Sequence, residues 1–296
     1  MRIADGLRAC NIARMPRFPP RLCTATVAIC AVAGAVAAQS PSPLPYETRF
    51  YTHDGLRLES YLYRPPGPGP FPLVVYNHGS ATPDEEKKEW PAPFIARLLA
   101  PAGYAVLVPE RRGYAKSEGK PFSEDIGADR GARYVARMDA EAGDALAAVD
   151  DVARDAALRI DPKRIAVVGV SFGGVVTTFA AARGPRFAAV VVQAPGALNW
   201  DKSPELRAAL LAAAPKIAVP IQCVVAENDR TTESARAVCK NARGTPAELK
   251  VYPPFTPTTL RENSAPGHAL FSFQGVKIWG PDLLDFLARH LPAPTP

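Results

Sequence analysis

The sequence predicts an α/β protein built on a doubly wound, mostly parallel sheet with helices on both faces. Two observations carry this prediction. Between residues 72 and 291, short apolar runs alternate with segments of helical period, and alternation of this kind is typical of a parallel sheet covered by helices. The apolar runs are also continuous rather than interrupted by polar residues, which indicates strands buried on both faces.

The predicted elements follow in order along the chain. An N-terminal antiparallel hairpin is expected over residues 48–65, because two alternating runs flank Asp54-Gly55, a strong turn dipeptide. The strands expected after it cover residues 72–79, 104–110, 164–170, 187–196, 221–227 and 247–252. The expected helices cover residues 90–103, 131–155, 172–183, 203–214, 231–243 and 281–291.

Residues 1–38 have the composition of a secretory signal peptide. They hold five arginines and one aspartate, and the basic part precedes an apolar run that ends in small residues. This pattern predicts cleavage near residue 38 and export to the periplasm or the medium. An uncleaved membrane anchor is the alternative, although the run is at the short limit for spanning a bilayer. A proline-rich lead-in over residues 39–46 and a single domain over 47–296 are expected to follow.

Charge and cysteine content exclude several classes of function. The formal net charge of +6 is mostly supplied by residues 1–38, and no basic run with interleaved aromatic residues follows, so no nucleic-acid partner is expected. Stable membrane insertion after cleavage is not expected either. Only Cys223 and Cys239 lie beyond the leader, too few for a disulfide scaffold or a zinc site. Neither a metal nor another cofactor is expected.

The sequence GVSFG at residues 169–173 places Ser171 between two glycines, where an expected strand meets an expected helix. A serine at such a turn is held as a nucleophile at the carboxyl end of the sheet, and the glycines let neighbouring backbones pass close by. A phosphate-binding turn is the alternative, but the spacing fits neither G-x-G-x-x-G nor G-x-x-x-x-G-K-[ST]. Ser171 is therefore the candidate nucleophile.

A serine hydroxyl needs a general base, and the position of each histidine decides between the candidates. His53 lies in the hairpin and His290 on the last helix, whereas His78 ends a strand and suits a loop that shapes the site. His268 lies in the long segment after the last strand, and loops at the carboxyl ends of parallel strands line the ligand crevice. His268 is the predicted base.

An acid is needed to orient the imidazole, and it is expected between Ser171 and His268 in the chain. The segment IQCVVAENDRTTE offers Glu227 and Asp229. We favour Asp229 because it lies deeper in the loop, just before the expected helix. A helix N-cap is the alternative role for an aspartate at this place.

Two backbone N–H groups are needed to hold an oxyanion, and those of Phe172 and Ser80 are predicted, with Gly79 as the alternative to Ser80. His78 and Tyr114 are candidate substrate contacts, with packing as the alternative for Tyr114. The segment Pro195–Lys216 is expected to form a small cap over the site, with a plain crossover helix and loop as the alternative.

Cys223 and Cys239 are a candidate disulfide. Strand and helix rise place both residues about 10 Å back from the turn between their elements, so the two side chains are level if they face each other. An oxidising compartment would let the bond form.

Taken together, these segments resemble the α/β-hydrolase superfamily, and within it the dienelactone-hydrolase-like and prolyl-oligopeptidase-like serine hydrolases. The resemblance covers about residues 71–291 and rests on NHGS, ERRGYAKSEG, DPKRIAVVGVSFGG, AENDRTTE and GHALF. The chain order Ser171, Asp229, His268 is also that of the superfamily's triad. It implies hydrolysis of esters, thioesters or amides through an acyl-serine, without a cofactor.

Two departures from the family pattern refine this expectation. Dienelactone hydrolases use a cysteine nucleophile, and this chain has Ser171. Prolyl peptidases normally carry a propeller domain, whereas only about thirty residues, the hairpin region, come between the leader and the core. The sequence therefore predicts an exported serine hydrolase of small-molecule carboxylic esters. An exported serine peptidase or amidase of the prolyl oligopeptidase type and a catalytically silent binding protein are the alternatives.

Overall fold

Eight strands form one mixed sheet in the computed structural model, which describes residues 44–293. Their order across the sheet is β1-β2-β4-β3-β5-β6-β7-β8, and the six strands from β4 to β8 run parallel, while β1 and β2 are antiparallel to their neighbours. The strands are β1 (Glu47–His53), β2 (Leu56–Tyr63), β3 (Phe71–Asn77), β4 (Ala105–Pro109), β5 (Ile160–Val170), β6 (Ala189–Gln193), β7 (Ile221–Ala226) and β8 (Ala247–Tyr252).

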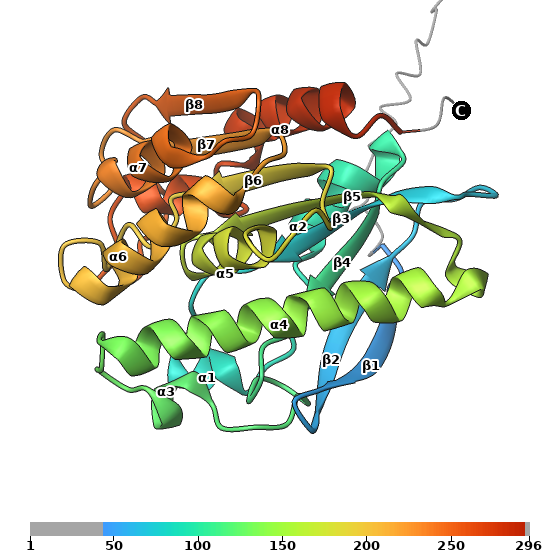
Figure 1. Cartoon of the computed structure of the whole chain (residues 1–296), viewed down its shortest axis with the longest axis horizontal. Coiled ribbons are helices and arrows are strands. Elements are labelled where there is room, and N and C mark those ends of the chain that lie inside the picture. The colour runs from blue at the N-terminus through green and yellow to red at the C-terminus, as the bar shows by residue number, and fades with distance from the viewer. Residues whose placement is uncertain (1–43, 294–296) are drawn as a thin grey trace, which may run out of the picture. The chain divides into compact units, whose positions relative to one another are not determined.

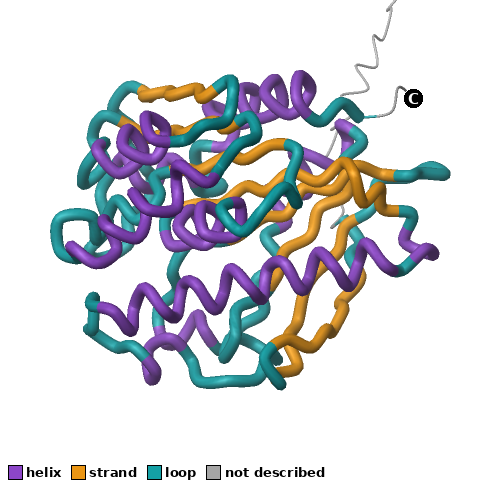
Figure 2. The backbone as a smooth tube through the Cα atoms, viewed as in Figure 1, coloured by secondary structure: helices purple, strands orange, loops and turns teal. Residues whose placement is uncertain are grey.

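Helices cover both faces of this sheet. In Figure 1, α4 to α7 lie in front of the strands and α2 and α8 lie behind them, and Figure 2 shows the same layers around the orange strands. The helices are α1 (Pro83–Glu86), α2 (Pro93–Leu99), α3 (Phe122–Asp125), α4 (Ala132–Arg154), α5 (Phe172–Ala181), α6 (Pro204–Ala213), α7 (Glu233–Asn241) and α8 (Val276–His290). The predicted fold class and N-terminal hairpin are confirmed.

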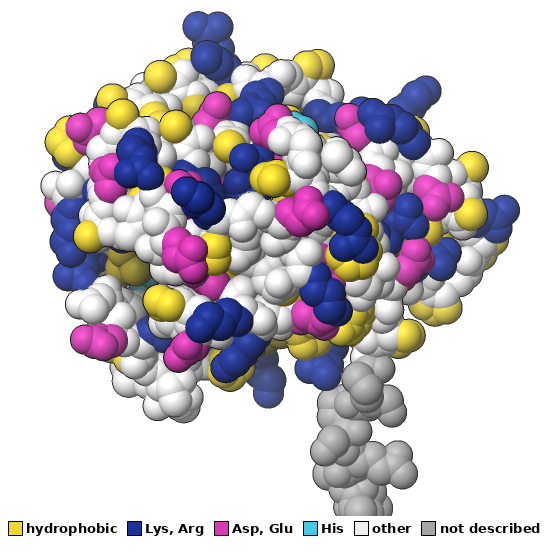
Figure 3. All heavy atoms as spheres, turned by 90° about the horizontal axis from the view of Figure 1, so that it is seen from below, with side chains coloured by type: hydrophobic (Ala, Val, Ile, Leu, Met, Phe, Trp, Pro, Cys, Tyr) yellow, Lys and Arg dark blue, Asp and Glu magenta, His cyan; other side chains and the backbone are white. Residues whose placement is uncertain are grey.

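Burial follows the sequence pattern that predicted the sheet. Every residue of β3, β4, β6 and β7 is buried, whereas the edge strands β1 and β8 have one buried residue each and are otherwise half-buried or exposed. Continuous apolar runs therefore mark strands covered on both faces. The surface in turn carries both signs of charge, and Figure 3 shows basic and acidic side chains interspersed over one face.

Three elements differ from the prediction. The short helices α1 and α3 lie in segments without helical period. Helix α1 is preceded by the N-cap residue Thr82, whose side chain forms a reciprocal capping box with Glu85, a signal present in the sequence. The closing helix begins at Val276 rather than at Pro281, which it contains; proline favours a first helical turn, and this preference set the predicted start.

The predicted cap at Pro195–Lys216 is instead the crossover between β6 and β7. Its helix α6 packs against α4, α5 and α7 in the front layer. The helix belongs to the helical layer on this side of the sheet, so the structure favours the crossover alternative for this segment. The predicted signal peptide lies outside the described residues. Within residues 44–293, no helix has both the length and the hydropathy needed to cross a membrane.

Two glycines allow β3, β5 and α5 to meet. A Cβ on Gly173 would lie 2.0 Å from the carbonyl oxygen of Asn77, and a Cβ on Gly169 would lie 2.2 Å from that of Gly173. These neighbours are backbone atoms, which cannot swing aside as a side chain can. The first turn of α5 is therefore pressed directly against the end of β3.

We expect Gly173→Ala to lower the free energy of unfolding by about 3 kcal/mol or more, because an overpacked backbone contact must move. Gly280→Ala in α8 is the matched control. There the added Cβ meets only the ends of flexible side chains, those of Leu98 and Val276, and the change should stay within about 1 kcal/mol. Urea unfolding followed by circular dichroism measures both variants, and equal midpoints would contradict the assigned role of Gly173.

Candidate active site

Ser171 stands at the turn between β5 and α5 in a conformation that few residues adopt. Its φ is 57° and its ψ is −115°, in a region that carries backbone strain for a residue with a side chain. Its N–H donates to the carbonyl of Gln193 at 2.8 Å, and its own carbonyl accepts from Gly196 at 3.0 Å. These two bonds tie the turn to the end of β6, so the surrounding structure holds the strained residue.

Asp229 and His268 form a hydrogen-bonded pair. Nδ1 of His268 lies 2.9 Å from Oδ2 and 3.1 Å from Oδ1 of Asp229. The Asp229 side chain is fully buried and that of His268 is 9% exposed. A carboxylate at Nδ1 favours the tautomer with its proton there, which leaves the Nε2 lone pair available as a base. Glu227, the alternative acid, is exposed.

Backbone contacts dock the His268 segment onto the loop after β7. Gly267 donates to the carbonyl of Asn228 at 3.1 Å, and a Cβ on Gly267 would lie 2.4 Å from the Asp229 nitrogen. The Asn228 amide both donates to and accepts from the backbone of Phe255 at 2.9 Å. Sequence reasoning missed Asn228 and Gly267, although an Asn beside the acid and a Gly before the base were visible.

The loop after β3 lies against Ser171. A Cβ on Gly79 would be 3.7 Å from the Cβ of Ser171, and Arg261, seven residues before His268, donates to the carbonyl of Ser80 at 2.7 Å. Among the described residues, the N–H groups of Gly79, Ser80 and Phe172 have no hydrogen-bond acceptor. Donors of this kind beside a nucleophile suit an oxyanion hole, and Gly79 and Ser80 both remain candidates.

Four of the predicted segments thus lie at the carboxyl ends of the strands: Ser171 contacts the loop after β3, Asp229 contacts His268, and Arg261 joins the His268 segment to Ser80. It does not show a hydrogen bond between Ser171 and His268; Nε2 of His268 is buried without a partner in the described part of the chain. Catalytic hydrogen bonds are often long in unliganded enzymes and tighten only around the substrate. The arrangement is chemically that of a serine, a base and an orienting acid.

His78 and Tyr114 do not face open space, which corrects their prediction as substrate contacts. His78 is 4% exposed, and its ring nitrogens lie 3.0 Å from Glu110 Oε1 and 2.9 Å from the Gly79 carbonyl. It lines a small internal cavity of about 20 Å³. The Tyr114 hydroxyl donates to Glu86 at 3.4 Å, and the ring is 2% exposed. Both side chains hold protein segments together.

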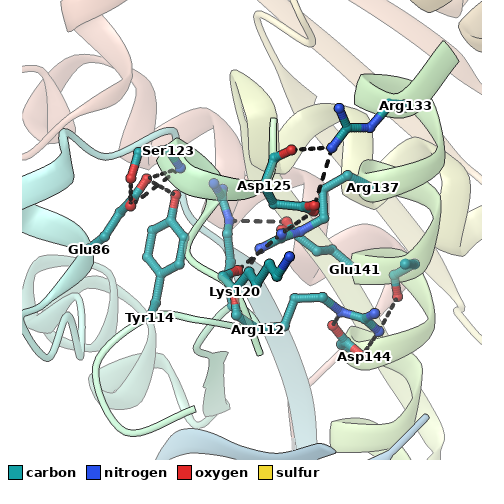
Figure 4. Close-up of polar contacts among 12 residues, drawn as sticks. Glu86, Arg112, Tyr114, Lys120, Ser123, Asp125, Arg133, Arg137, Glu141 and Asp144 are labelled. Carbon is teal, nitrogen blue, oxygen red and sulfur yellow. Dashed lines mark hydrogen bonds and ion pairs between the residues drawn. The ribbon is translucent and has the colours of Figure 1, made fainter. Parts of the chain in front are cut away.

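The short helices α1 and α3 adjoin this site and are joined through Glu86. Its buried carboxylate accepts from the Ser123 backbone at 3.1 Å and from the Ser123 hydroxyl at 2.5 Å. Figure 4 shows Glu86 pointing towards Ser123 and Tyr114. Arg261 also pairs with Glu85 of α1 at 2.8 Å. Helix α1 is therefore linked to the loop at Ser80 through Arg261, and α3 is linked to α1 through Glu86.

A group with metal-ligand geometry lies elsewhere, at His53, Asp54 and Asp144. Arg112 donates to Asp144 at 2.6 and 2.7 Å and to Asp54 at 3.1 Å; Figure 4 shows the contact with Asp144. A guanidinium already neutralises these carboxylates, so the residues fit an ion-pair cluster better than a cation site.

Cys223 on β7 and Cys239 on α7 are both buried and both free thiols in this structure. The Cys239 thiol lies against Cys223, and burial raises the pKa of the Cys223 thiol. The expected facing of the two elements is present, and the disulfide itself stays a prediction.

Fold and site together define a serine hydrolase of the α/β-hydrolase class. The profile of the X-Pro dipeptidyl-peptidase (S15) family matches residues 54–249, about two thirds of the chain. The chain therefore belongs to this family. The match ends before His268, so the base rests on the geometry described above.

Similar proteins carry different activities in their names. The uncharacterized peptidase YuxL of Bacillus subtilis is 30% identical over 161 residues, which cover 53% of this chain and 22% of YuxL. The quorum-quenching protein AidA of Acinetobacter baumannii is 32% identical over 151 residues, which cover 51% of this chain and 44% of AidA. The chain thus spans less than half the length of these two relatives.

A solved structure with the same architecture is the esterase Pf2001 of Pyrococcus furiosus. It superposes with a TM-score of 0.59 at 19% identity, covering 84% of this chain and 92% of the esterase. A likeness at this identity shows the fold alone.

The contact between Asp229 and His268 leads to a prediction that separates the two acids. Asp229→Asn favours the wrong imidazole tautomer, so hydrolysis of p-nitrophenyl acetate should fall by about 10²- to 10⁴-fold. Glu227→Gln, the matched control at the exposed alternative, should change the rate less than about twofold, since surface changes are usually small. Steady-state kinetics on folded variants checks this, and equal losses would contradict the role given to Asp229.

The thiol pair leads to a second prediction. In protein directed to an oxidising compartment, we expect Cys223 and Cys239 to be bridged. The mass should then be lower by two hydrogen atoms, and no thiol should react after unfolding without reductant. Two reactive thiols in that sample would rule the bridge out.

Proposed function

We propose that the chain is an exported serine hydrolase that cleaves carboxylic esters through an acyl intermediate on Ser171. The observation that carries the proposal is the hydrogen-bonded pair of Asp229 and His268, at the same sheet edge as the strained Ser171. Strain of this kind is concentrated at functional sites. Membership of a peptidase family within the serine hydrolases supports the reaction type.

In the proposed first half-reaction, Nε2 of His268 takes the hydroxyl proton as Oγ of Ser171 attacks the ester carbonyl. The C=O electron pair moves onto oxygen, and the N–H groups of Phe172 and Ser80 hydrogen-bond to that oxyanion. Collapse breaks the bond to the alcohol, which leaves with the proton from His268. Water then attacks the acyl-serine in the same way and releases the acid.

Asp229 stabilises the imidazolium that forms in each step. Its carboxylate lies against Nδ1 and also accepts from the Arg230 backbone at 2.6 Å, which fixes its orientation. A fully buried carboxylate is costly unless it is paired and hydrogen-bonded. Both conditions are met here, so the carboxylate is held facing Nδ1 of His268.

Three arginines on the loops around the site are one support for esters over peptides with a free amino terminus, and Glu227 is the exposed carboxylate nearest to Asp229 in the sequence. The charged side chains on its loops include Arg111 at the His78 carbonyl, Arg261 at the Ser80 carbonyl and Arg230 beside Asp229. Glu85 and Glu110, which contact the same loops, are each bonded to a protein donor. A terminal ammonium needs an acceptor to offset its desolvation, whereas a neutral ester does not.

A peptidase or amidase of the prolyl oligopeptidase type is the second candidate. It is favoured by the family description and by the name of YuxL. A catalytically silent binding protein is the third, and it has no physical need for a paired acid and base beside a strained serine.

Export is part of the proposal and is supported by the basic and apolar pattern of residues 1–38. The substrate is proposed to be a small-molecule ester, with no nucleic-acid partner and no stable membrane insertion after cleavage, because the chain beyond the leader is close to neutral.

The test compares p-nitrophenyl acetate, butyrate and octanoate with glycyl-prolyl and alanyl p-nitroanilides, for wild type and Ser171→Ala. We expect ester turnover at least about tenfold faster than amide turnover and a loss of at least about 10³-fold in Ser171→Ala, since the nucleophile is removed. The variant must retain its circular dichroism spectrum.

Each outcome favours one of the three candidate functions. Faster cleavage of the dipeptidyl anilide, dependent on Ser171, would replace the esterase by the peptidase. Equal rates in wild type and Ser171→Ala would reject Ser171 as the nucleophile. No turnover of either substrate class would favour the silent binding protein.

A further inference from the structure

We propose that Arg111 is a positioning residue. It fixes the relative orientation of the two backbone donors of the oxyanion hole, the N–H groups of Ser80 and Phe172. The inference rests on the proposed function and adds a residue that does not touch the substrate. Arg111 follows β4, and only 6% of it is exposed. A buried guanidinium is costly unless its contacts compensate, so what it contacts indicates why it is there.

The first contact is with the loop that carries Ser80. Nη2 of Arg111 donates to the carbonyl of His78, and the His78 ring lies 2.9 Å from the carbonyl of Gly79. In a trans peptide, C=O and N–H point in opposite directions. Fixing the carbonyls of His78 and Gly79 therefore aims the N–H groups of Gly79 and Ser80 the opposite way.

Glu110 completes this fixation of the loop. Its carboxylate lies 3.0 Å from Nε2 of His78 and accepts from the backbone of Arg111 at 3.3 Å and of Trp90 at 3.1 Å. Glu110 thus holds the ring of His78, and the next residue, Arg111, holds its carbonyl. The loop has little freedom to rotate its peptide planes.

The second contact is with the other donor. The Arg111 guanidinium carbon lies 3.9 Å above the ring centre of Phe172, a favourable cation–π geometry. The Phe172 ring also belongs to an aromatic cluster, with Phe122 at 5.2 Å and Tyr134 at 6.1 Å between ring centres. One guanidinium therefore spans two segments about 90 residues apart, each bearing a proposed oxyanion donor.

The third contact anchors Arg111 to α4. Its Nε lies 3.4 Å from Oε2 of Glu141. The other oxygen of Glu141 accepts from Arg137 at 2.8 Å, and Arg137 also pairs with Asp125 of α3 at 2.8 Å. Figure 4 shows Arg137 between Asp125 and Glu141. Helix α4, the longest helix of the described chain, thus holds the Arg111 side chain in place through Glu141.

Arg137 is the matched control that this geometry supplies. It is also 6% exposed and shares Glu141, yet its hydrogen bonds run to Lys120, Arg112, Asp125 and Glu141 rather than to the oxyanion segments. A lysine keeps the charge at either position but lacks the planar fork. Arg111→Lys and Arg137→Lys therefore each remove a planar guanidinium that pairs with Glu141. Only Arg111→Lys also removes contacts with the two oxyanion segments.

The experiment measures kcat and KM for p-nitrophenyl acetate and the inhibition constant of a trifluoromethyl ketone. Attack of the serine hydroxyl on the ketone carbonyl gives a tetrahedral adduct whose oxygen is an oxyanion. For Arg111→Lys we expect kcat to fall about 10- to 100-fold, less than the 10²- to 10³-fold typical for loss of a whole donor. KM should change less than about threefold, and the inhibition constant should rise in parallel with the loss of kcat/KM. Arg137→Lys should lower the melting temperature with less than a threefold change in these quantities, because changes away from the transition state leave them untouched.

Equal kinetic losses in the two variants, or an unchanged inhibition constant in Arg111→Lys, would overturn the inference. If Arg111→Lys does not fold, Phe172→Leu replaces it. That variant keeps the backbone N–H of residue 172 and removes the ring under the guanidinium. We again expect the inhibition constant to rise in parallel with the loss of kcat/KM. A change in KM alone would overturn the inference. Ser171→Ala separates the two claims: activity that survives it defeats the proposed function, whereas a normal kcat in Arg111→Lys defeats only the clamp.

Discussion

The close approach of Gly173 to the carbonyl of Asn77 is the constraint on which the site depends. It presses the first turn of α5 against the end of β3, so Ser171 at the start of that turn and the loop at Gly79 become neighbours. The strained φ of Ser171 occurs at the start of this same turn. A larger residue at position 173 would separate the nucleophile from the backbone donors on the adjacent strand.

Polar contacts then join the loops that carry the other site residues. Asn228 and Gly267 join the loop after β7 to the segment of His268, and Arg261 joins that segment to the loop of Ser80. Three buried polar or charged side chains, those of His78, Glu110 and Arg111, hold the loop of Ser80 from the interior of the protein. Buried charge is seldom the most stabilising solution; here it fixes peptide orientation, which apolar packing alone does not specify.

The sequence predicted the parts of this arrangement that follow from local pattern. Continuous apolar runs located the buried strands, and glycines around Ser171 located the strand-to-helix turn. Helix α1 was missed although Thr82 and Glu85 form a capping box, because four residues give no period. The roles of His78 and Tyr114 were misjudged for a different reason. Their partners, Glu110 and Glu86, are about 30 residues away, and only the folded chain brings such groups together.

The central claim is that Ser171 is a nucleophile activated by His268 and Asp229. The most direct measurement is covalent labelling of the folded protein with a fluorophosphonate, followed by mass spectrometry of its peptides. The account predicts a single adduct on the peptide that contains Ser171, with labelling that slows sharply in His268→Ala. An adduct on another residue, or ester hydrolysis that continues with Ser171 fully labelled, would contradict it.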